Sequence, residues 1–175
     1  MFTFVTGTGY TGRRLLHMLP ADEAAGLSRS RGDAGRTHFV FDLDTATSLP
    51  VSLPDDYSVV YTVPPAGNPD HRLHQFLPLL DPTPKRFVYI STTGVYGDCH
   101  GQRVTEATPV NPSNERSARR VAAEKLLADW ARGTNCRLVV LRVPGIYGPG
   151  RLGIEQLEAG TPVLNEQSAN PGNRI

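Results

Sequence analysis

Hydrophobic positions along this chain fall into short continuous runs that alternate with stretches of helical period. Runs rich in β-branched and aromatic residues are typical of strands buried on both faces; they cover Phe2–Thr6, a segment ending at Leu27–Ser28, His38–Phe41, Tyr57–Thr62, Arg86–Ser91 and Arg137–Arg142. The intervening pattern predicts helices over Thr11–Leu19, His71–Leu80 and Glu115–Trp130. This alternation predicts an α/β fold, a Rossmann-type doubly wound parallel sheet of about six strands with helices on both faces.

The apolar pattern is clear in the last of these helices and weak near the end of the chain. Apolar residues repeat at helical spacing in the helix, at Ala118, Val121, Ala122, Leu126 and Trp130. After Pro149-Gly150 the pattern weakens. We expect a short helix over Leu152–Leu157 and a polar loop from Asn165 onward.

A glycine-rich turn directly follows the first strand and opens the first helix. It has the pattern G-x-G-x-x-G, formed by Gly7, Thr8, Gly9, Tyr10, Thr11 and Gly12. The first glycine permits the tight turn, the second lets backbone amides approach a pyrophosphate, and the third lets the helix pack close to the strand. In this strand–turn–helix context the motif predicts dinucleotide binding at a helix N-terminus. The alternative is an ordinary β–α turn without a ligand.

The residues after the second strand bear on which dinucleotide is bound. An NAD site normally offers an acidic side chain to the ribose 2′-hydroxyl about 20 residues past the turn. This chain instead has Ser28 and Arg29 there, and no acid until Asp33. Arg29 could pair with a 2′-phosphate and Ser28 could donate a hydrogen bond to it, which favours NADP over NAD. The alternative is that Arg29 is a solvated surface residue.

Four motifs in order along residues 1 to about 150 resemble the extended and atypical short-chain dehydrogenase/reductases, which include the NAD-dependent epimerase/dehydratase family. They are Gly7–Gly12, Asp42-Leu43, Ser91–Gly97 and Arg142–Pro149. The resemblance implies that Asp42 and Leu43 flank the adenine, that Thr62, Val63 and Pro64 line the cofactor cleft, and that Pro144 lies near the nicotinamide. It also implies that Thr92 is the substrate-orienting hydroxyl.

The active pair of the family is altered in this chain. Members carry a Tyr followed four residues later by a Lys, whereas residues 97–124 contain neither type. Counting back from Glu124, which matches a Glu of the family, puts Arg120 at the Lys position and Arg116 at the Tyr position. Arginine is a poor general acid or base. Arg116 and Arg120, one helical turn apart, could instead bind an anion or form a solvated basic face.

Other positions narrow the reaction class. Tyr96 and Tyr147 follow strands, and either could replace the missing Tyr, although we expect packing roles for both. Dehydratase members carry Asp-Glu after the active-site Thr, where this chain has Thr93 and Gly94, so we do not expect a sugar-nucleotide dehydratase. The glycine turn is one residue shorter than in typical extended members, which indicates the atypical branch.

The resemblance also suggests a domain division and an assembly. We expect residues 1–150 to form an NAD(P)-binding domain and residues 151–175 to begin a truncated C-terminal segment. Family members often dimerise through helices after the fourth and fifth strands, so a homodimer is a prediction by analogy.

Composition excludes some classes of partner. Lys plus Arg number 18 against 17 for Asp plus Glu, so no excess of basic charge indicates nucleic-acid binding. No apolar run is long enough to cross a membrane. Cys99 and Cys136 lack C-x-x-C spacing, which favours reduced thiols in a cytoplasmic protein. His71 and His74 have no accompanying ligand cluster, so we expect no metal site.

Two functions are consistent with this sequence. One is an NAD(P)-dependent, epimerase/dehydratase-like oxidoreductase acting on a small-molecule substrate, with hydride transfer near Thr92. The other is a catalytically silent NADP-binding module that has regulatory or redox-sensing roles. Retention of the glycine turn without the Tyr and Lys would fit the second.

Overall fold

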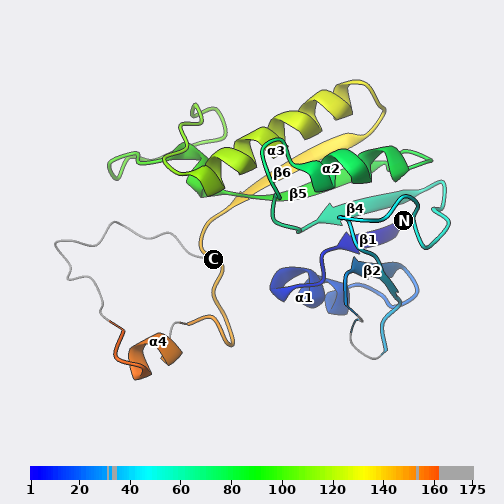
Figure 1. Cartoon of the computed structure of the whole chain (residues 1–175), viewed down its shortest axis with the longest axis horizontal. Coiled ribbons are helices and arrows are strands. Elements are labelled where there is room, and N and C mark those ends of the chain that lie inside the picture. Colours follow the sequence, from blue (N-terminus) through cyan, green and yellow to red (C-terminus); the bar gives the residue numbers. More distant parts are fainter. Residues whose placement is uncertain (31, 33–34, 153, 162–175) are drawn as a thin grey trace.

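The computed structural model describes residues 1–30, 32, 35–152 and 154–161, and they form one six-stranded sheet (Figure 1). The strands are β1 (Phe2–Thr6), β2 (Ala24–Ser28), β3 (His38–Val40), β4 (Tyr57–Tyr61), β5 (Arg86–Thr92) and β6 (Arg137–Val143). The helices are α1 (Tyr10–Met18), α2 (His71–Phe76), α3 (Glu115–Arg132) and α4 (Ile154–Glu158), with 3-10 turns η1 (Leu77–Leu79) and η2 (Thr93–Tyr96).

The strand order confirms the predicted doubly wound sheet. It runs β3-β2-β1-β4-β5-β6, and every neighbouring pair is parallel. The chain winds outward from β1 in one direction and then continues from β4 in the other. Open α/β sheets bind ligands at the carboxyl ends of the strands where this direction reverses, which here is between β1 and β4.

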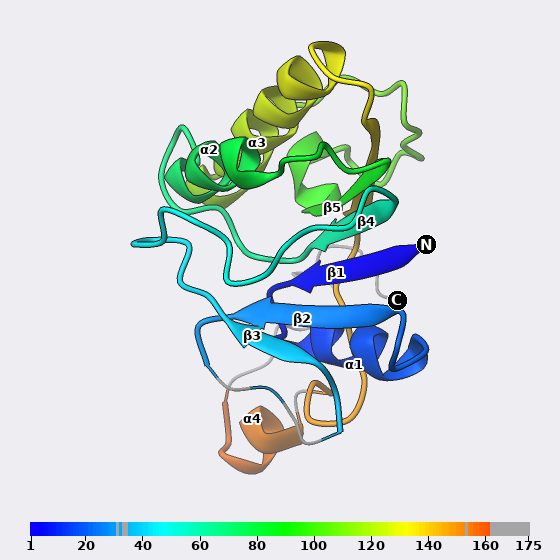
Figure 2. The same ribbon diagram turned by 90° about the vertical axis from the view of Figure 1, so that its right-hand side faces the viewer.

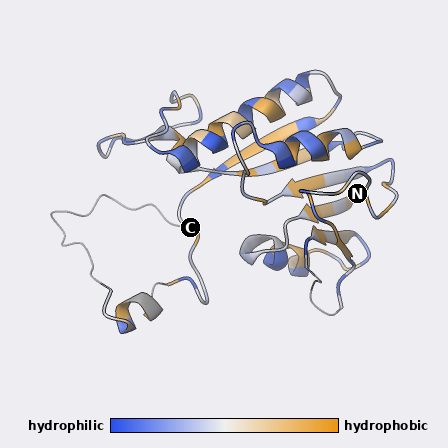
Figure 3. Ribbon diagram, viewed as in Figure 1, coloured by the Kyte–Doolittle hydropathy of each residue, from blue (hydrophilic) through white to orange (hydrophobic). Residues whose placement is uncertain are grey.

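Helices lie on both faces of the sheet, as predicted, but they cover the two faces unequally (Figure 2). The larger core cluster, which includes Phe4, Tyr61, Phe87 and Leu127, lies on the face that α2 and α3 cover. Hydrophobic strands run through this layer in Figure 3. Val5, Leu16 and Ala24 form the smaller cluster beneath α1. The described part of the chain leaves the β5–β6 end of this second face less covered, and Leu141 is 43% exposed there.

The apolar stripe predicted for α3 is only partly right. Leu126 and Trp130 pack against the core, but Ala118, Val121 and Ala122 are half-buried. The fully buried positions of the helix are Ser117, Ala123, Glu124 and Leu127. Two of these four are polar because they face the carboxyl ends of the strands, and apolar periodicity alone therefore gives the wrong phase.

The predicted elements differ in small ways from the observed ones. The helix predicted over His71–Leu80 ends at Phe76 and continues as η1, because Pro78 lacks the N–H that would prolong an α-helix. The short helix predicted near the end of the chain is α4, whereas the tail from Asn165 lies outside the described residues, as do Arg31 and Asp33.

The remaining sequence expectations concern thiols and membranes. Cys99 and Cys136 are free thiols, and burial raises the pKa of Cys136 to about 11. None of the helices in the described ranges has the length and apolar character needed to cross a bilayer.

Candidate functional site

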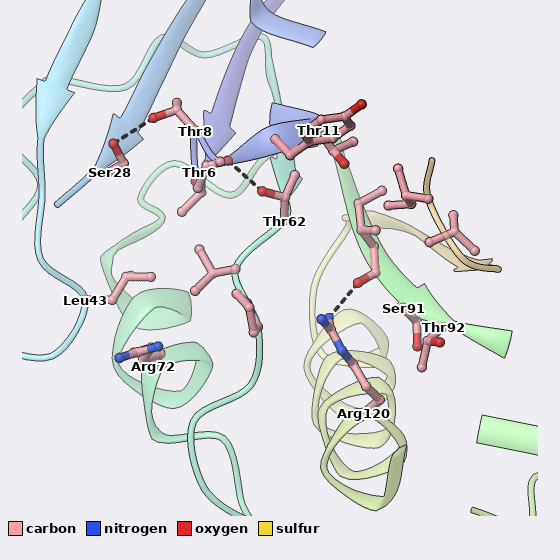
Figure 4. A pocket seen from close by; sticks show the side chains of 18 of the residues that line it. Thr6, Thr8, Thr11, Ser28, Leu43, Thr62, Arg72, Ser91, Thr92 and Arg120 are labelled. Carbon is pink, nitrogen blue, oxygen red and sulfur yellow. Dashed lines mark hydrogen bonds between the residues drawn. The ribbon is translucent and has the colours of Figure 1, made fainter. Parts of the chain in front are cut away.

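A cleft of about 860 Å³ opens at the carboxyl ends of the strands (Figure 4). It brings together the residues that sequence reasoning placed in the site. They are Gly7, Thr8, Gly9, Tyr10, Thr11, Ser28, Arg29, Asp42, Leu43, Thr62, Val63, Pro64, Thr92, Arg116, Arg120 and Pro144. Gly12 is the exception, because it is buried beneath the cleft rather than on its wall.

Each glycine of the turn between β1 and α1 has a different physical reason. Gly7 has a φ of +90°, which side chains rarely tolerate. A Cβ on Gly12 would lie 2.0 Å from the carbonyl oxygen of Gly7, so only glycine lets the helix approach this closely. A Cβ on Gly9 would meet no atom within 4 Å. The space beside Gly9 is therefore open.

The N-terminus of α1 lacks the side-chain caps that α2 and α3 have. Asn114 caps α3 by accepting a hydrogen bond from the Ser117 N–H at 2.9 Å, and Asp70 caps α2 in the same way. At α1 the N-cap is Gly9, which has no side chain to do this, and the first turn carries no acidic residue. The first N–H groups of α1 and the positive end of its dipole are therefore available to an anion.

At the end of β2, Ser28 belongs to a polar network that sequence reasoning missed. Its hydroxyl lies 2.7 Å from Thr8 Oγ1 (Figure 4) and 2.9 Å from His38 Nε2, and it donates to the Ser30 carbonyl at 3.0 Å. A hydroxyl has one proton, so Ser28 must give up its bond to Ser30 before it can donate to a ligand. Arg29 is exposed at the same edge of the cleft.

On the opposite wall, the structure gives Arg116 and Arg120 different environments. Arg120 Nη1 donates to the Ile90 carbonyl oxygen at 2.7 Å and to the Tyr89 hydroxyl at 3.1 Å, which fastens α3 to β5 (Figure 4). Tyr89 is fully buried, and burial raises its pKa to about 12. Arg116 is exposed, and its guanidinium contacts no carboxylate among the described residues. The two arginines therefore do not act as an equivalent pair.

Thr92 lies on the same wall as Arg116, and its hydroxyl proton is available for a hydrogen bond to a ligand. Its Oγ1 accepts a hydrogen bond from the Gly94 N–H at 3.2 Å and is thereby fixed at the end of β5. Ser117 lies next to it, since a Cβ on Gly94 would be 2.8 Å from Ser117 Oγ. Thr92 can therefore donate to a substrate oxygen without losing a bond within the protein.

A buried polar network supports this wall from behind. Ser91 Oγ donates to Glu124, and the Arg142 guanidinium binds the same carboxylate, with Nη2 2.8 Å from Oε2. The hydrogen bond to Glu124 holds the pKa of Arg142 above its usual range. Arg142 Nη1 also donates to the Tyr96 hydroxyl at 2.9 Å. The network joins β5, η2, α3 and β6. Sequence reasoning matched Glu124 to the family but did not predict these contacts.

Neither tyrosine considered as a replacement for the missing Tyr lies on the cleft. Tyr96 is buried, as the packing expectation requires, and its hydroxyl is bound to Arg142. Tyr147 is 52% exposed, so a packing role for it is wrong. It lies on the loop after β6, outside the helices and strands of the described residues.

The charge of the cleft wall is strongly unbalanced. Among the described lining residues, five are arginines (Arg29, Arg72, Arg116, Arg120 and Arg151), and one is a carboxylate, Asp42. Arg72 is neutralised by Asp44, with Nη2 2.6 Å from Oδ2, and this contact holds the pKa of Asp44 well below its usual range. The remaining positive charge suits a ligand with several anionic groups. No sequence pattern indicated that Arg72 or Arg151 would line the cleft.

The two histidines considered for metal binding do not form a ligand cluster. His71 Nε2 lies 2.9 Å from Asp44 Oδ1 at the start of α2. Within the described ranges, no group of three or more His, Cys, Asp or Glu side chains is placed to hold a metal ion.

Known proteins are similar to this chain in sequence over part of its length. The family model of the NAD dependent epimerase/dehydratase family matches residues 76–163. A dTDP-glucose 4,6-dehydratase of Neisseria gonorrhoeae is 42% identical over 66 residues, which are 37% of this chain and 19% of that protein. The low-salt glycan biosynthesis protein Agl12 of Haloferax volcanii is 33% identical over 70 residues, 40% of this chain and 23% of its own length. The chain thus matches about a fifth of these curated relatives.

Solved structures share the fold over most of the chain. A functionally unknown conserved protein from Silicibacter pomeroyi DSS has a TM-score of 0.72 at 27% identity and covers 100% of this chain and 64% of that one. MoeE5 in complex with UDP-glucuronic acid and NAD has a TM-score of 0.71 at 19% identity, with coverage of 93% and 63%. A UDP-glucose 4-epimerase has a TM-score of 0.67 at 19% identity, with coverage of 85% and 53%.

Because the network behind the cleft is buried, we expect two ion pairs on the same helix to contribute very differently to the free energy of unfolding. Replacing Glu124 with Gln leaves the Arg142 charge without its partner, and we expect the free energy of unfolding to fall by about 3 kcal/mol. Glu115→Gln, which removes the exposed pair with Arg119, serves as the control and should have a much smaller effect. Urea unfolding of both variants measures this. Equal losses would show that the Glu124 network does not hold the wall.

Proposed function

The chain belongs to the NAD dependent epimerase/dehydratase family, and on that premise we propose that its cleft binds NADP and that it is an epimerase/dehydratase-like oxidoreductase of the atypical short-chain dehydrogenase/reductase type. The observation that carries the proposal is the uncapped N-terminus of α1 beside the open space at Gly9. Both features suit a pyrophosphate, which needs N–H donors and close backbone approach.

We assign the two ends of the cleft by the residues that line them. Asp42 and Leu43 would flank the adenine, with Thr62, Val63 and Pro64 along the centre. Pro144 and Thr92 would lie at the nicotinamide end. Two solved proteins that share this fold, a short-chain dehydrogenase/reductase superfamily protein from Agrobacterium tumefaciens and MoeE5, have NAD bound, which supports a dinucleotide without distinguishing NAD from NADP.

The preference for NADP rests on Arg29. Its guanidinium is exposed at the end of β2 and has no carboxylate partner in the part of the chain that the structure describes. Ser28 is already engaged with Thr8, His38 and Ser30. We therefore infer that Arg29, more than Ser28, pairs with a 2′-phosphate. NAD is the alternative cofactor.

Catalysis would use a reduced set of side chains. A bound nicotinamide supplies or accepts the hydride. Thr92 would donate a hydrogen bond to the substrate oxygen, and Arg116 would stabilise negative charge that develops there, because arginine keeps its charge. Arg120 would hold α3 in place. The proton that a phenol usually carries would come from water, since no Tyr or Lys is present in residues 97–124.

One feature separates this chain from its dehydratase relatives. Thr93 and Gly94 stand where dehydratase members carry an acid and a base, so we propose carbonyl–alcohol interconversion or epimerisation rather than dehydration.

The second candidate function is a catalytically silent NADP-binding regulatory or redox-sensing module. The bonds that fix Arg120 to β5 favour it, because they leave the Lys position with a structural role.

Further expectations accompany this proposal. Residues 1–150 contain all six strands and would form the NAD(P)-binding unit, with a C-terminal segment beginning at residue 151. A cytoplasmic location and a homodimer remain predictions from the sequence.

Cofactor preference is tested by calorimetric titration of the protein and of Arg29→Ala with NADPH and NADH. We expect the variant to bind NADPH about tenfold more weakly, because a charge-assisted bond to the 2′-phosphate is lost. NADH affinity should stay the same, and it serves as the internal control. An equal loss for both cofactors, or no loss, would contradict the assignment of Arg29.

Turnover is tested by following NADPH absorbance with a panel of aldehydes and ketones. For an active enzyme we expect substrate-dependent oxidation, which Thr92→Val slows at least about tenfold by removing a hydrogen-bond donor. Ser113→Ala, an exposed change outside the cleft lining, is the control. No oxidation of bound NADPH by any carbonyl compound would favour the silent module.

A further inference from the structure

Tyr10, the first residue of α1, has two arginines over its ring. The Arg14 Cζ lies 3.5 Å from the ring centroid and the Arg151 Cζ lies 4.1 Å from it. Arg14 comes from the next turn of the same helix, whereas Arg151 comes from the segment after β6, which runs past α1 in Figure 2. Residues far apart in sequence thus meet at the entrance to the glycine turn.

The two arginines differ in their freedom. Arg14 Nη1 donates to the Tyr10 carbonyl oxygen at 3.0 Å and does not line the cleft. Arg151 is exposed, lines the cleft together with Tyr10 and Thr11, and makes no hydrogen bond or ion pair through its guanidinium within the described residues. Only Arg151 can therefore turn its N–H groups toward a ligand without breaking a hydrogen bond.

The backbone before Arg151 is shaped to fit against Tyr10. The Arg151 N–H donates to the Gly148 carbonyl at 2.8 Å, which closes a tight turn. Gly148 has a φ of +142°, and a Cβ there would lie 2.4 Å from the Tyr10 hydroxyl. The turn therefore lies directly on the tyrosine, and this contact determines where Arg151 emerges.

The surroundings of Arg151 are positive. Arg14 shares the same aromatic ring, and the adjacent N-terminus of α1 has no acidic residue in its first turn. A stacked cation gains little at an exposed site, and like charges repel. An anion in the cleft beside Tyr10 would attract Arg151 and the helix terminus, whereas Arg14 lies outside the cleft lining and stays bound to the Tyr10 carbonyl.

We propose that Arg151 is a second binding residue for the cofactor pyrophosphate, which it contacts from the loop after β6 while Tyr10 holds it ready. The inference rests on the proposed function, which places the pyrophosphate at the glycine turn. Its consequence is that the loop carrying Pro144 is tied to the turn from β1 to α1 across the cleft when an anion is bound.

Calorimetric titration of Arg151→Met distinguishes this role from others. Met keeps an apolar stem and removes the charge. We expect NADH, NADPH and ADP-ribose, which all contain the pyrophosphate, to bind about tenfold more weakly. Adenosine 2′-phosphate, which lacks the pyrophosphate, should bind with unchanged affinity. Arg29→Ala should give the opposite pattern, with losses for NADPH and adenosine 2′-phosphate alone.

Arg14→Met is the matched control, because Arg14 stacks on the same ring outside the cleft. It should change ADP-ribose affinity less than about twofold. Unchanged ADP-ribose affinity in Arg151→Met, or an equal loss in Arg14→Met, would overturn the proposal for Arg151 while wild-type binding upheld the cofactor site. Failure of the wild-type chain to bind any of these ligands would overturn the proposed function, and the role of Arg151 with it.

Discussion

The close contact between Gly12 and the carbonyl oxygen of Gly7 is the constraint on which the site depends. A side chain at Gly12 would lie 2.0 Å from that oxygen, so the position requires glycine. The same oxygen accepts a hydrogen bond from Thr62 Oγ1 at 2.6 Å, which ties the end of β4 to the turn. One carbonyl thus sets the distance between β1, α1 and β4. Because the winding of the sheet reverses between these two strands, this contact also sets the floor of the cleft.

The opposite wall has its own anchor. Glu124 receives hydrogen bonds from Ser91 and Arg142, while Arg120 fastens α3 to β5. These bonds consume the polar groups behind the wall and leave Thr92 and Arg116 on its surface. Buried polar contacts therefore hold the wall of the cleft, and exposed arginines lie at its edges. Such a division suits a ligand that is anionic at several points, since the wall would position its phosphates and the arginines would neutralise them.

Sequence reasoning predicted the elements that form the cleft but not all of the contacts between their side chains. The strands, the glycine turn and most residues of the cleft wall were predictable, because each depends on a local pattern such as Gly7–Gly12. The phase of α3 was not, because its buried face includes Glu124, whose partner Arg142 lies 18 residues later. The engagement of Ser28 with His38 and the approach of Arg151 to Tyr10 also arise only when distant segments meet. Local patterns contain no information on such pairs.

Whether the space beside Gly9 holds a pyrophosphate is tested most directly by calorimetric titration of the wild-type chain and of Gly9→Ala with NADPH. An added Cβ meets no atom of the described residues within 4 Å, so the variant should fold with at most a small loss of stability from the change at the N-cap. We predict that the wild type binds NADPH and that the variant loses at least about tenfold in affinity, because its methyl group occupies the place of the phosphate. Equal binding by the two proteins, or no binding by the wild type, would contradict a pyrophosphate site at Gly9.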